Sequence, residues 1–193
     1  MNKTLLIFLA AFGLVLSGYC ADTSVHLSSV SPASENQGWG ILQIDKSVSG
    51  SALSIGGRKF EHGLGTHAVS EIVYDLEDLS ATAFTAMVGA DDALKDHPEV
   101  KKASMVFQVF VDGIKKFDSG VMHIGDQAKP VNVDLKGAGE LKLVVNDAGD
   151  GNTCDHADWA EGVVEIQKSV VSSQNSESRY TVKAKGITVR LDK

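Results

Sequence analysis

The chain has 193 residues, a formal net charge of −7 at pH 7 and a pI near 5.3. This acidic balance argues against a nucleic-acid partner, which would need a basic stripe on the surface. The length allows one domain of about 140–150 residues plus extensions. Nineteen glycines against three prolines indicate many tight turns, and so favour short strands over a helical bundle.

Residues 1–21 have the layout of a secretory signal peptide. Lys3 precedes the apolar run of residues 5–16, and small or polar residues follow. The run is shorter than the roughly 20 residues that a membrane-spanning helix needs, so a membrane anchor is the weaker interpretation. With cleavage near Cys20 or Ala21, the chain is predicted to be secreted, periplasmic or held at the cell surface.

The cysteines predict a core without disulfides. Once the signal peptide is removed, Cys154 is the expected remaining thiol, and a single cysteine cannot form an internal disulfide. A cysteine nucleophile with His156 as its base is the alternative. The two residues are too close in sequence to assume an aligned geometry, so we favour an unpaired loop thiol.

From about residue 25 the pattern predicts short strands separated by turns. The strand at 103–112 alternates clearly, and Asp112-Gly113 after it predicts a hairpin turn with two positive φ angles. Pro98 makes 92–102 a polar loop. The other strands are predicted at 52–55, 71–76, 82–89, 131–135, 141–145 and 162–167. Strands at this spacing predict an all-β fold, a two-sheet antiparallel sandwich.

The character of the chain changes after Gln167. Residues 168–178 are rich in serine and lack a periodic face, which predicts a linker. Residues 179–193 then resemble a hairpin, with Lys185-Gly186 near its turn. Two strands alone bury too little apolar area to be stable. This C-terminal hairpin therefore either packs against the main domain or docks on a partner protein. The sequence leaves both possibilities open.

Four segments, in this order, resemble the NPCBM-type domain, which is carbohydrate-binding module family 51. They begin with Gly38-Trp39-Gly40, Gly63-Leu64-Gly65-Thr66-His67-Ala68, Val88-Gly89-Ala90-Asp91-Asp92 and Asn146-Asp147-Ala148-Gly149-Asp150-Gly151, the last running into Asp155-His156-Ala157-Asp158-Trp159-Ala160. The match covers about residues 25–167. It implies a jelly-roll sandwich like that of galactose-binding domains, and a non-catalytic module that binds galactose-type sugars. Cys154 and the C-terminal hairpin depart from the family pattern.

A sugar-binding site needs fixed polar groups for the hydroxyls and usually an aromatic ring for the apolar face of the sugar. Polar residues of these types follow the ends of several predicted strands. With tryptophan scarce, they predict a small pocket for a terminal sugar. The predicted ligand-binding residues are Trp39, His67, Asp91, Asp92, Asn146, Asp147, Asp150, His156, Asp158 and Trp159.

Several of these residues also have a structural interpretation. Gly63 and Gly65 suit a backbone geometry that excludes side chains. His67 and Trp159 could equally be core residues. Trp39 could be either a core residue or a contact to the sugar. Asp150 could cap a turn through its own backbone.

Calcium is the predicted cofactor. The loop at 147–158 is rich in aspartate, the hard oxygen ligand that calcium takes, but it lacks the spacing of an EF-hand. Resemblance to calcium-containing sandwich modules implies a structural ion. Asp45 and Asp158 are its predicted ligands, because such folds often bring the early loop near the last strand.

Three functions are compatible with the sequence. The leading hypothesis is a lectin-like module that binds galactose-type glycans without turnover. A structural or cell-envelope interaction protein with a vestigial sugar site is the alternative. A glycoside hydrolase is the third, and it would need two carboxyl groups about 5–9.5 Å apart. No feature of the sequence singles out such a pair, so we do not expect an enzyme.

Overall fold

A computed structural model describes residues 22–167, 180–184 and 187–191. The longer strands are β1 (Asp22–His26), β2 (Ser34–Gln37), β6 (Gly63–His67), β7 (Ser70–Asp75), β8 (Ala81–Ala90), β9 (Met105–Val111), β10 (Ile114–Met122), β11 (Lys129–Asp134), β12 (Glu140–Asn146) and β13 (His156–Gln167). Short strands are β3 (Gln43–Ile44), β4 (Ser54–Ile55) and β5 (Arg58–Lys59), and the 3-10 helices are η1 (Leu27–Ser29), η2 (Asp92–Leu94) and η3 (Val100–Lys102). The remaining strands are β14 (Tyr180–Ala184) and β15 (Ile187–Leu191).

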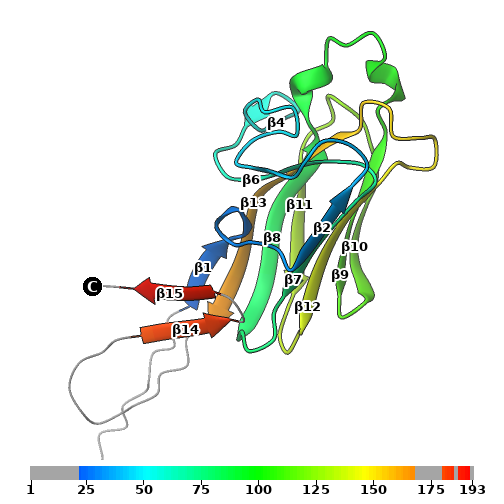
Figure 1. Ribbon diagram of the computed structural model, residues 1–193. Helices are drawn as coiled ribbons and strands as arrows, with labels where there is room; N and C mark the ends of the chain where they lie inside the picture. The colour runs from blue at the N-terminus through cyan, green and yellow to red at the C-terminus, as the bar shows by residue number, and fades with distance from the viewer. Residues whose placement is uncertain (1–21, 168–179, 185–186, 192–193) are drawn as a thin grey trace, which may run out of the picture.

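Two antiparallel sheets pack face to face (Figure 1). One has the order β11-β8-β13-β6-β3, with β1 paired to the second half of β13. The other has the order β10-β9-β12-β7-β2. This architecture confirms the predicted two-sheet sandwich.

The core lies between the sheets because alternate residues of each strand face inward. On β9 these are Met105, Phe107, Val109 and Val111, the face that the alternation predicts. Trp159 of β13 is fully buried against them, with its ring centroid 5.3 Å from that of Phe107. Burying apolar surface of this extent between two sheets is the main source of stability.

A covering segment, residues 46–60, lies on the outer face of the β6-β13-β8 sheet. Leu53, Ile55 and Phe60 of this segment form a second, smaller core with Ala160. At Gly65 of β6, an added Cβ would lie 2.2 Å from the carbonyl oxygen of Lys46. The outer face of this sheet is therefore buried at one end. The alternation of residues along the strands would instead predict that this face is exposed to solvent.

The hairpin prediction is confirmed by the backbone. Asp112 and Gly113 have φ of 49° and 76°, and they join β9 to β10. The predicted loop at 92–102 contains the short helices η2 and η3. The short edge strands β2 and β3 carry no alternation long enough to predict them.

The ends of the chain are described only in part. Residues 1–21 and 168–178, the predicted signal peptide and linker, lie outside the described residues. Strands β14 and β15 pair antiparallel, with Tyr180 opposite Leu191. No helix within the described ranges is both long and apolar enough to cross a bilayer.

Gly65→Ala should destabilise the domain strongly. The new methyl group would collide with backbone atoms of Lys46, Ser47 and Val48, which cannot rotate away as a side chain can. We expect a loss of about 3 kcal/mol in the free energy of unfolding, or about 10 °C in Tm. Thermal denaturation measures it. Gly113→Ala, at a glycine whose Cβ would meet nothing within 4 Å, tests the cost of positive φ alone.

Candidate functional site

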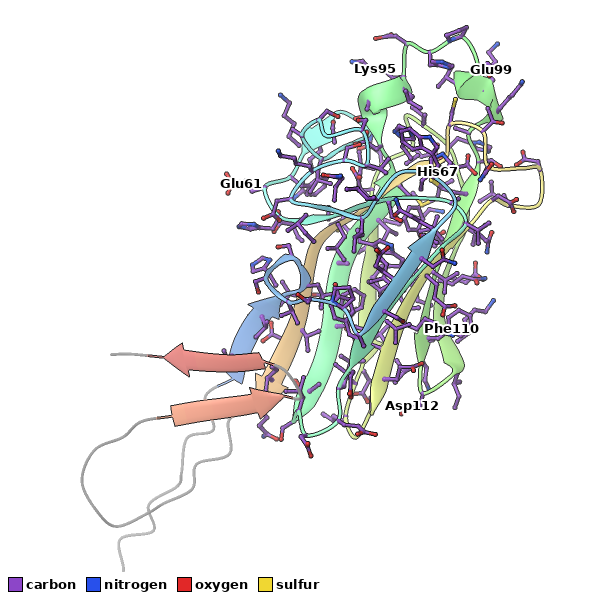
Figure 2. All side chains as sticks on the ribbon, viewed as in Figure 1. Glu61, His67, Lys95, Glu99, Phe110 and Asp112 are labelled. Carbon is purple, nitrogen blue, oxygen red and sulfur yellow. The ribbon has the colours of Figure 1, made fainter. Side chains whose placement is uncertain are left out.

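Three aromatic side chains gather at the loop end of the sandwich. The ring of Trp39 lies 5.6 Å from that of His67 and 5.6 Å from that of His156, centroid to centroid. The Trp39 and His156 rings are nearly parallel, at 15°, and the two histidine rings are 5.5 Å apart. Figure 2 shows His67 near this end and Asp112 at the opposite end. Trp39 is 55% exposed, whereas both histidines are buried.

Strand register explains why the two histidines meet. His67 ends β6, and His156 begins β13 directly opposite it in the antiparallel pairing. Residues directly opposite in such a pair have neighbouring side chains on the same face of the sheet. Both rings therefore project from the outer face, beside the covering segment.

Each histidine is neutral at pH 7. The Nδ1 of His67 lies 2.6 Å from the carbonyl oxygen of Ala68. Because a carbonyl only accepts, Nδ1–H donates and Nε2 keeps the free lone pair. Burial lowers the pKa of His67, and burial, together with the repulsion that a protonated His67 would exert, lowers the pKa of His156. His67 therefore keeps Nε2 as a hydrogen-bond acceptor, on a ring that packs beside Trp39 and His156.

Backbone and amide groups hold the rim around Trp39. The amide of Gln37 donates to the Trp39 carbonyl at 2.7 Å, and its oxygen accepts from the Thr66 hydroxyl. The Asn152 amide donates to the Ala68 carbonyl at 3.0 Å. A Cβ on Gly38 would lie 2.5 Å from that same oxygen. The loop that carries Trp39 is thus held against the end of β6.

Asp91, Asp92 and Asp158 lie beside this cluster, and two of them are fully buried. Asp91 accepts from the Ser47 hydroxyl at 2.8 Å, and the Ser54 amide lies 3.3 Å from both the Asp91 and the Asp158 carboxyls. Asp92, half-buried, accepts from the Ser54 hydroxyl and the Gly57 amide. Asp91 and Asp158 therefore face the covering segment instead of solvent, which argues against direct contact with a sugar.

Asn146, at the end of β12, and Asp147 and Asp150, in the loop that follows, form hydrogen bonds that lead away from the aromatic cluster. The side-chain oxygens of Asn146 and Asp147 accept from backbone amides two residues later, as in Asx turns. Asp150 accepts from the Ser104 hydroxyl at 2.8 Å. Trp159 is fully buried in the core, where its direct contact with a ligand is sterically excluded.

Sequence reasoning missed three residues around the cluster. Gln37 and Asn152 have no signal in the sequence, because a single side-chain amide belongs to no distinguishing pattern. His97, in the loop between η2 and η3, lies 3.5 Å from the Cys154 sulfur. It is also close enough to His156 to lower the pKa of that histidine by charge repulsion. Only the folding of two distant loops onto β13 brings it there.

The two predicted calcium ligands do not fit one ion. Asp45 is exposed, and its carboxylate accepts from the Gly63 amide at 3.0 Å and lies 3.5 Å from His62 Nδ1. Asp158 is buried beneath the covering segment and shares none of these partners. Calcium takes six to eight oxygens at 2.3–2.6 Å. Across the described residues, no three His, Cys, Asp or Glu side chains are grouped to hold a metal.

The family model of the NPCBM/NEW2 domain matches residues 23–165. The chain belongs to this family. The matched range contains both sheets and the aromatic cluster, so this NPCBM domain is a carbohydrate-binding module, as the four sequence segments predict.

Solved structures of family 51 modules have the same fold. The CBM51 module of Clostridium perfringens GH95, in complex with methyl-galactose, is 38% identical with a TM-score of 0.67, over 74% of this chain and 99% of that one. A CBM51-2 structure with INT domains of Clostridium perfringens ZmpB, in complex with GlcNAc, is 35% identical with a TM-score of 0.69. That match covers 75% of this chain and 32% of that one.

Curated relatives are much longer proteins. The alpha-1,3-galactosidase B of Akkermansia muciniphila is 33% identical over 124 residues, which are 63% of this chain and 15% of that protein. A relative from Renibacterium salmoninarum is 35% identical over 133 residues, 65% of this chain and 8% of its own length. The chain thus spans a small part of each.

Proposed function

We propose that this NPCBM domain binds terminal galactose-type sugars of glycans through Trp39, His67 and His156. The observation that carries the proposal is the exposed indole of Trp39, which stacks on His156 and packs beside His67, both of them buried. The indole offers an apolar surface for the C–H face of a sugar ring. The free Nε2 of His67 accepts a hydrogen bond from a hydroxyl, and the Asn152 amide lies on the same rim.

The ligand class is supported by two observations. Two of the similar solved modules are in complex with methyl-galactose and GlcNAc. The cluster contains a single exposed indole, which suits one sugar ring at a chain end more than the long aromatic platform that a crystalline polysaccharide needs. A hexose or N-acetylhexosamine at a glycan terminus is therefore the proposed ligand.

The module is proposed to bind without catalysis. Asp91, which follows β8, and Asp158 of β13 are buried and hydrogen-bonded within the protein. Glycoside cleavage needs two carboxyl groups that reach the glycosidic bond from either side. Incubation with aryl galactosides should therefore release no aryl group, even at high protein concentration.

Export is proposed from the signal-like pattern of residues 1–21. Binding to glycans outside the cell agrees with such export. The role of the C-terminal hairpin in contacting a partner protein stays a prediction.

A glycan array followed by isothermal titration tests the proposed function. The protein should retain glycans with terminal galactose or N-acetylhexosamine, and methyl-galactoside should compete. The absence of any glycan signal from folded protein would instead favour the structural or cell-envelope role.

Acid pH should weaken sugar binding. Because burial lowers the pKa of His67 and His156, both stay neutral from pH 8 down to the ordinary histidine pKa of about 6.5. Below that, protonation removes the acceptor at His67 and places two like charges side by side. Titration calorimetry should give a constant Kd for methyl-galactoside at neutral pH and a rising Kd once the pH falls below the ordinary histidine pKa. A Kd that falls with acidity would exclude an acceptor role for His67.

A further inference from the structure

Exposed apolar side chains gather beside the sugar site. Among the described residues six large apolar side chains are exposed, and four of them form what we call the apolar rim: Trp39, Ile41, Ile44 and Val69. The other two lie on β10. Single exposed apolar residues are ordinary on a protein surface, but a group of them marks a place where another molecule binds.

Backbone contacts bring the two segments of the apolar rim together. A Cβ on Gly38 would lie 2.5 Å from the carbonyl oxygen of Ala68 and 3.0 Å from the amide nitrogen of Val69. The chain that leads into Trp39 therefore lies directly against the chain that leads into Val69. After Trp39, the chain continues into β3, which pairs with β6. The rim thus follows the edge of the sheet from the sugar site.

Ile41 is the most exposed member of the rim, at 69%. The residues on either side of it are held by the protein. A Cβ on Gly40 would lie 3.1 Å from the Val48 side chain, so this turn lies close to the covering segment. Leu42 packs against the main core. Ile41 is therefore presented to solvent by a loop that is fixed on both sides, which lowers the entropy lost when a ligand binds.

The apolar rim has no charged neighbours along the chain. Residues 38–44 and 68–70 contain no Asp, Glu, Lys or Arg. Besides the indole N–H, their polar side chains are those of Gln43 and Ser70, and Ser70 is buried. The neighbouring loop at 147–152 is instead polar, with Asp147, Asp150 and Asn152. One part of the surroundings of the sugar site can therefore pair with hydroxyls, and the rim cannot.

This composition favours an apolar group on the rim over a second sugar ring. The hydroxyls of a second sugar would leave water without finding hydrogen-bond partners on the rim, which costs free energy. An alkyl or acyl chain has no hydroxyls, and it gains free energy for each methylene group that leaves water. A charged group would find no opposite charge there.

We propose that the preferred ligands are galactose-type sugars joined directly to an apolar chain, and that Ile41 and Val69 are specificity-determining residues for that chain. The proposal rests on the proposed function, in which the sugar ring lies on Trp39. The Cα atoms of Trp39 and Ile41 are at most about 7 Å apart, because only two residues separate them. A chain attached to the bound sugar therefore reaches Ile41 without a long linker.

The test compares methyl-galactoside with hexyl-galactoside of the same anomeric form by titration calorimetry. The ratio of the two Kd values, taken within each variant, cancels changes in the contacts to the sugar itself. The wild type should bind hexyl-galactoside about tenfold more tightly, which is the factor expected for burying about two methylene groups. In Ile41→Ser and in Val69→Ser the ratio should fall to about threefold or less, because part of the apolar contact is lost.

Ile114→Ser is the matched control. It removes the same type of side chain as Ile41→Ser, 60% exposed on β10, and should keep the tenfold ratio. Neutral phosphatidylcholine vesicles with a galactosyl lipid then identify the source of the chain. Co-sedimentation of the wild type, lost in Ile41→Ser, supports a membrane lipid as the ligand. A tenfold ratio without co-sedimentation supports a free glycoside of the same chemistry.

Two results would overturn this proposal and leave the proposed function intact, because methyl-galactoside still binds in both. The first is an equal Kd for the two galactosides in the wild type. The second is a tenfold ratio that persists in both Ile41→Ser and Val69→Ser, since the chain would then bind elsewhere. Folded wild-type protein that binds neither galactoside would overturn the proposed function and this proposal with it.

Discussion

Trp39→Ala should abolish most of the affinity for galactose-type sugars. The indole is 55% exposed, yet it is held in place by the stacked ring of His156 and by the amide of Gln37. Removing a large aromatic contact at the centre of a binding site costs about 2 kcal/mol or more, which is about a 30-fold rise in Kd. Isothermal titration with methyl-galactoside measures this rise.

Two control variants test whether binding needs the aromatic ring of Trp39 or only an exposed apolar side chain. Trp39→Phe keeps an aromatic face of smaller area, so its Kd should fall between those of the wild type and Trp39→Ala. Ile114→Ala removes an equally exposed apolar side chain, 60% exposed in the hairpin at the far end of the sandwich, and should leave Kd unchanged. The same Kd for Trp39→Ala and the wild type would place the sugar elsewhere.

Trp159→Ala should produce the largest loss of stability. The side chain is fully buried between the sheets, with ring centroids 5.3 Å from Phe107 and 6.5 Å from Phe84. Truncating a buried tryptophan leaves a cavity and costs about 4 kcal/mol in the free energy of unfolding, or about 12 °C in Tm. Chemical and thermal denaturation measure the two quantities.

The conservative variant tests whether Trp159 belongs to the core or to the sugar site. Trp159→Phe should lower Tm by less than the alanine variant, and its Kd for methyl-galactoside should match that of the wild type. A raised Kd with an unchanged Tm would contradict the core role and return Trp159 to the list of ligand contacts.

The sequence predicts one group of ligand-binding residues, but their surroundings in the fold separate this group into two sets. His67, Asp91, His156 and Asp158 all occupy outward positions near the ends of adjacent strands. The covering segment buries the two aspartates completely, whereas the two histidine rings pack beside the exposed Trp39, His156 stacked on it and His67 tilted to it. The same residue pattern therefore yields a candidate sugar site and a buried carboxyl pair a few residues apart.

The sequence by itself determined the sandwich, the hairpin at Asp112-Gly113 and the family. These features depend on local chemistry: the alternation of residues along a strand, the positive φ of a tight turn, and motifs in a fixed order. Only the tertiary structure decided which outward residues meet solvent, because that depends on residues 46–60, distant in sequence, lying across β6 and β13. It likewise paired Trp39 with His67 and His156, since contacts between loops leave no periodic signal in the chain.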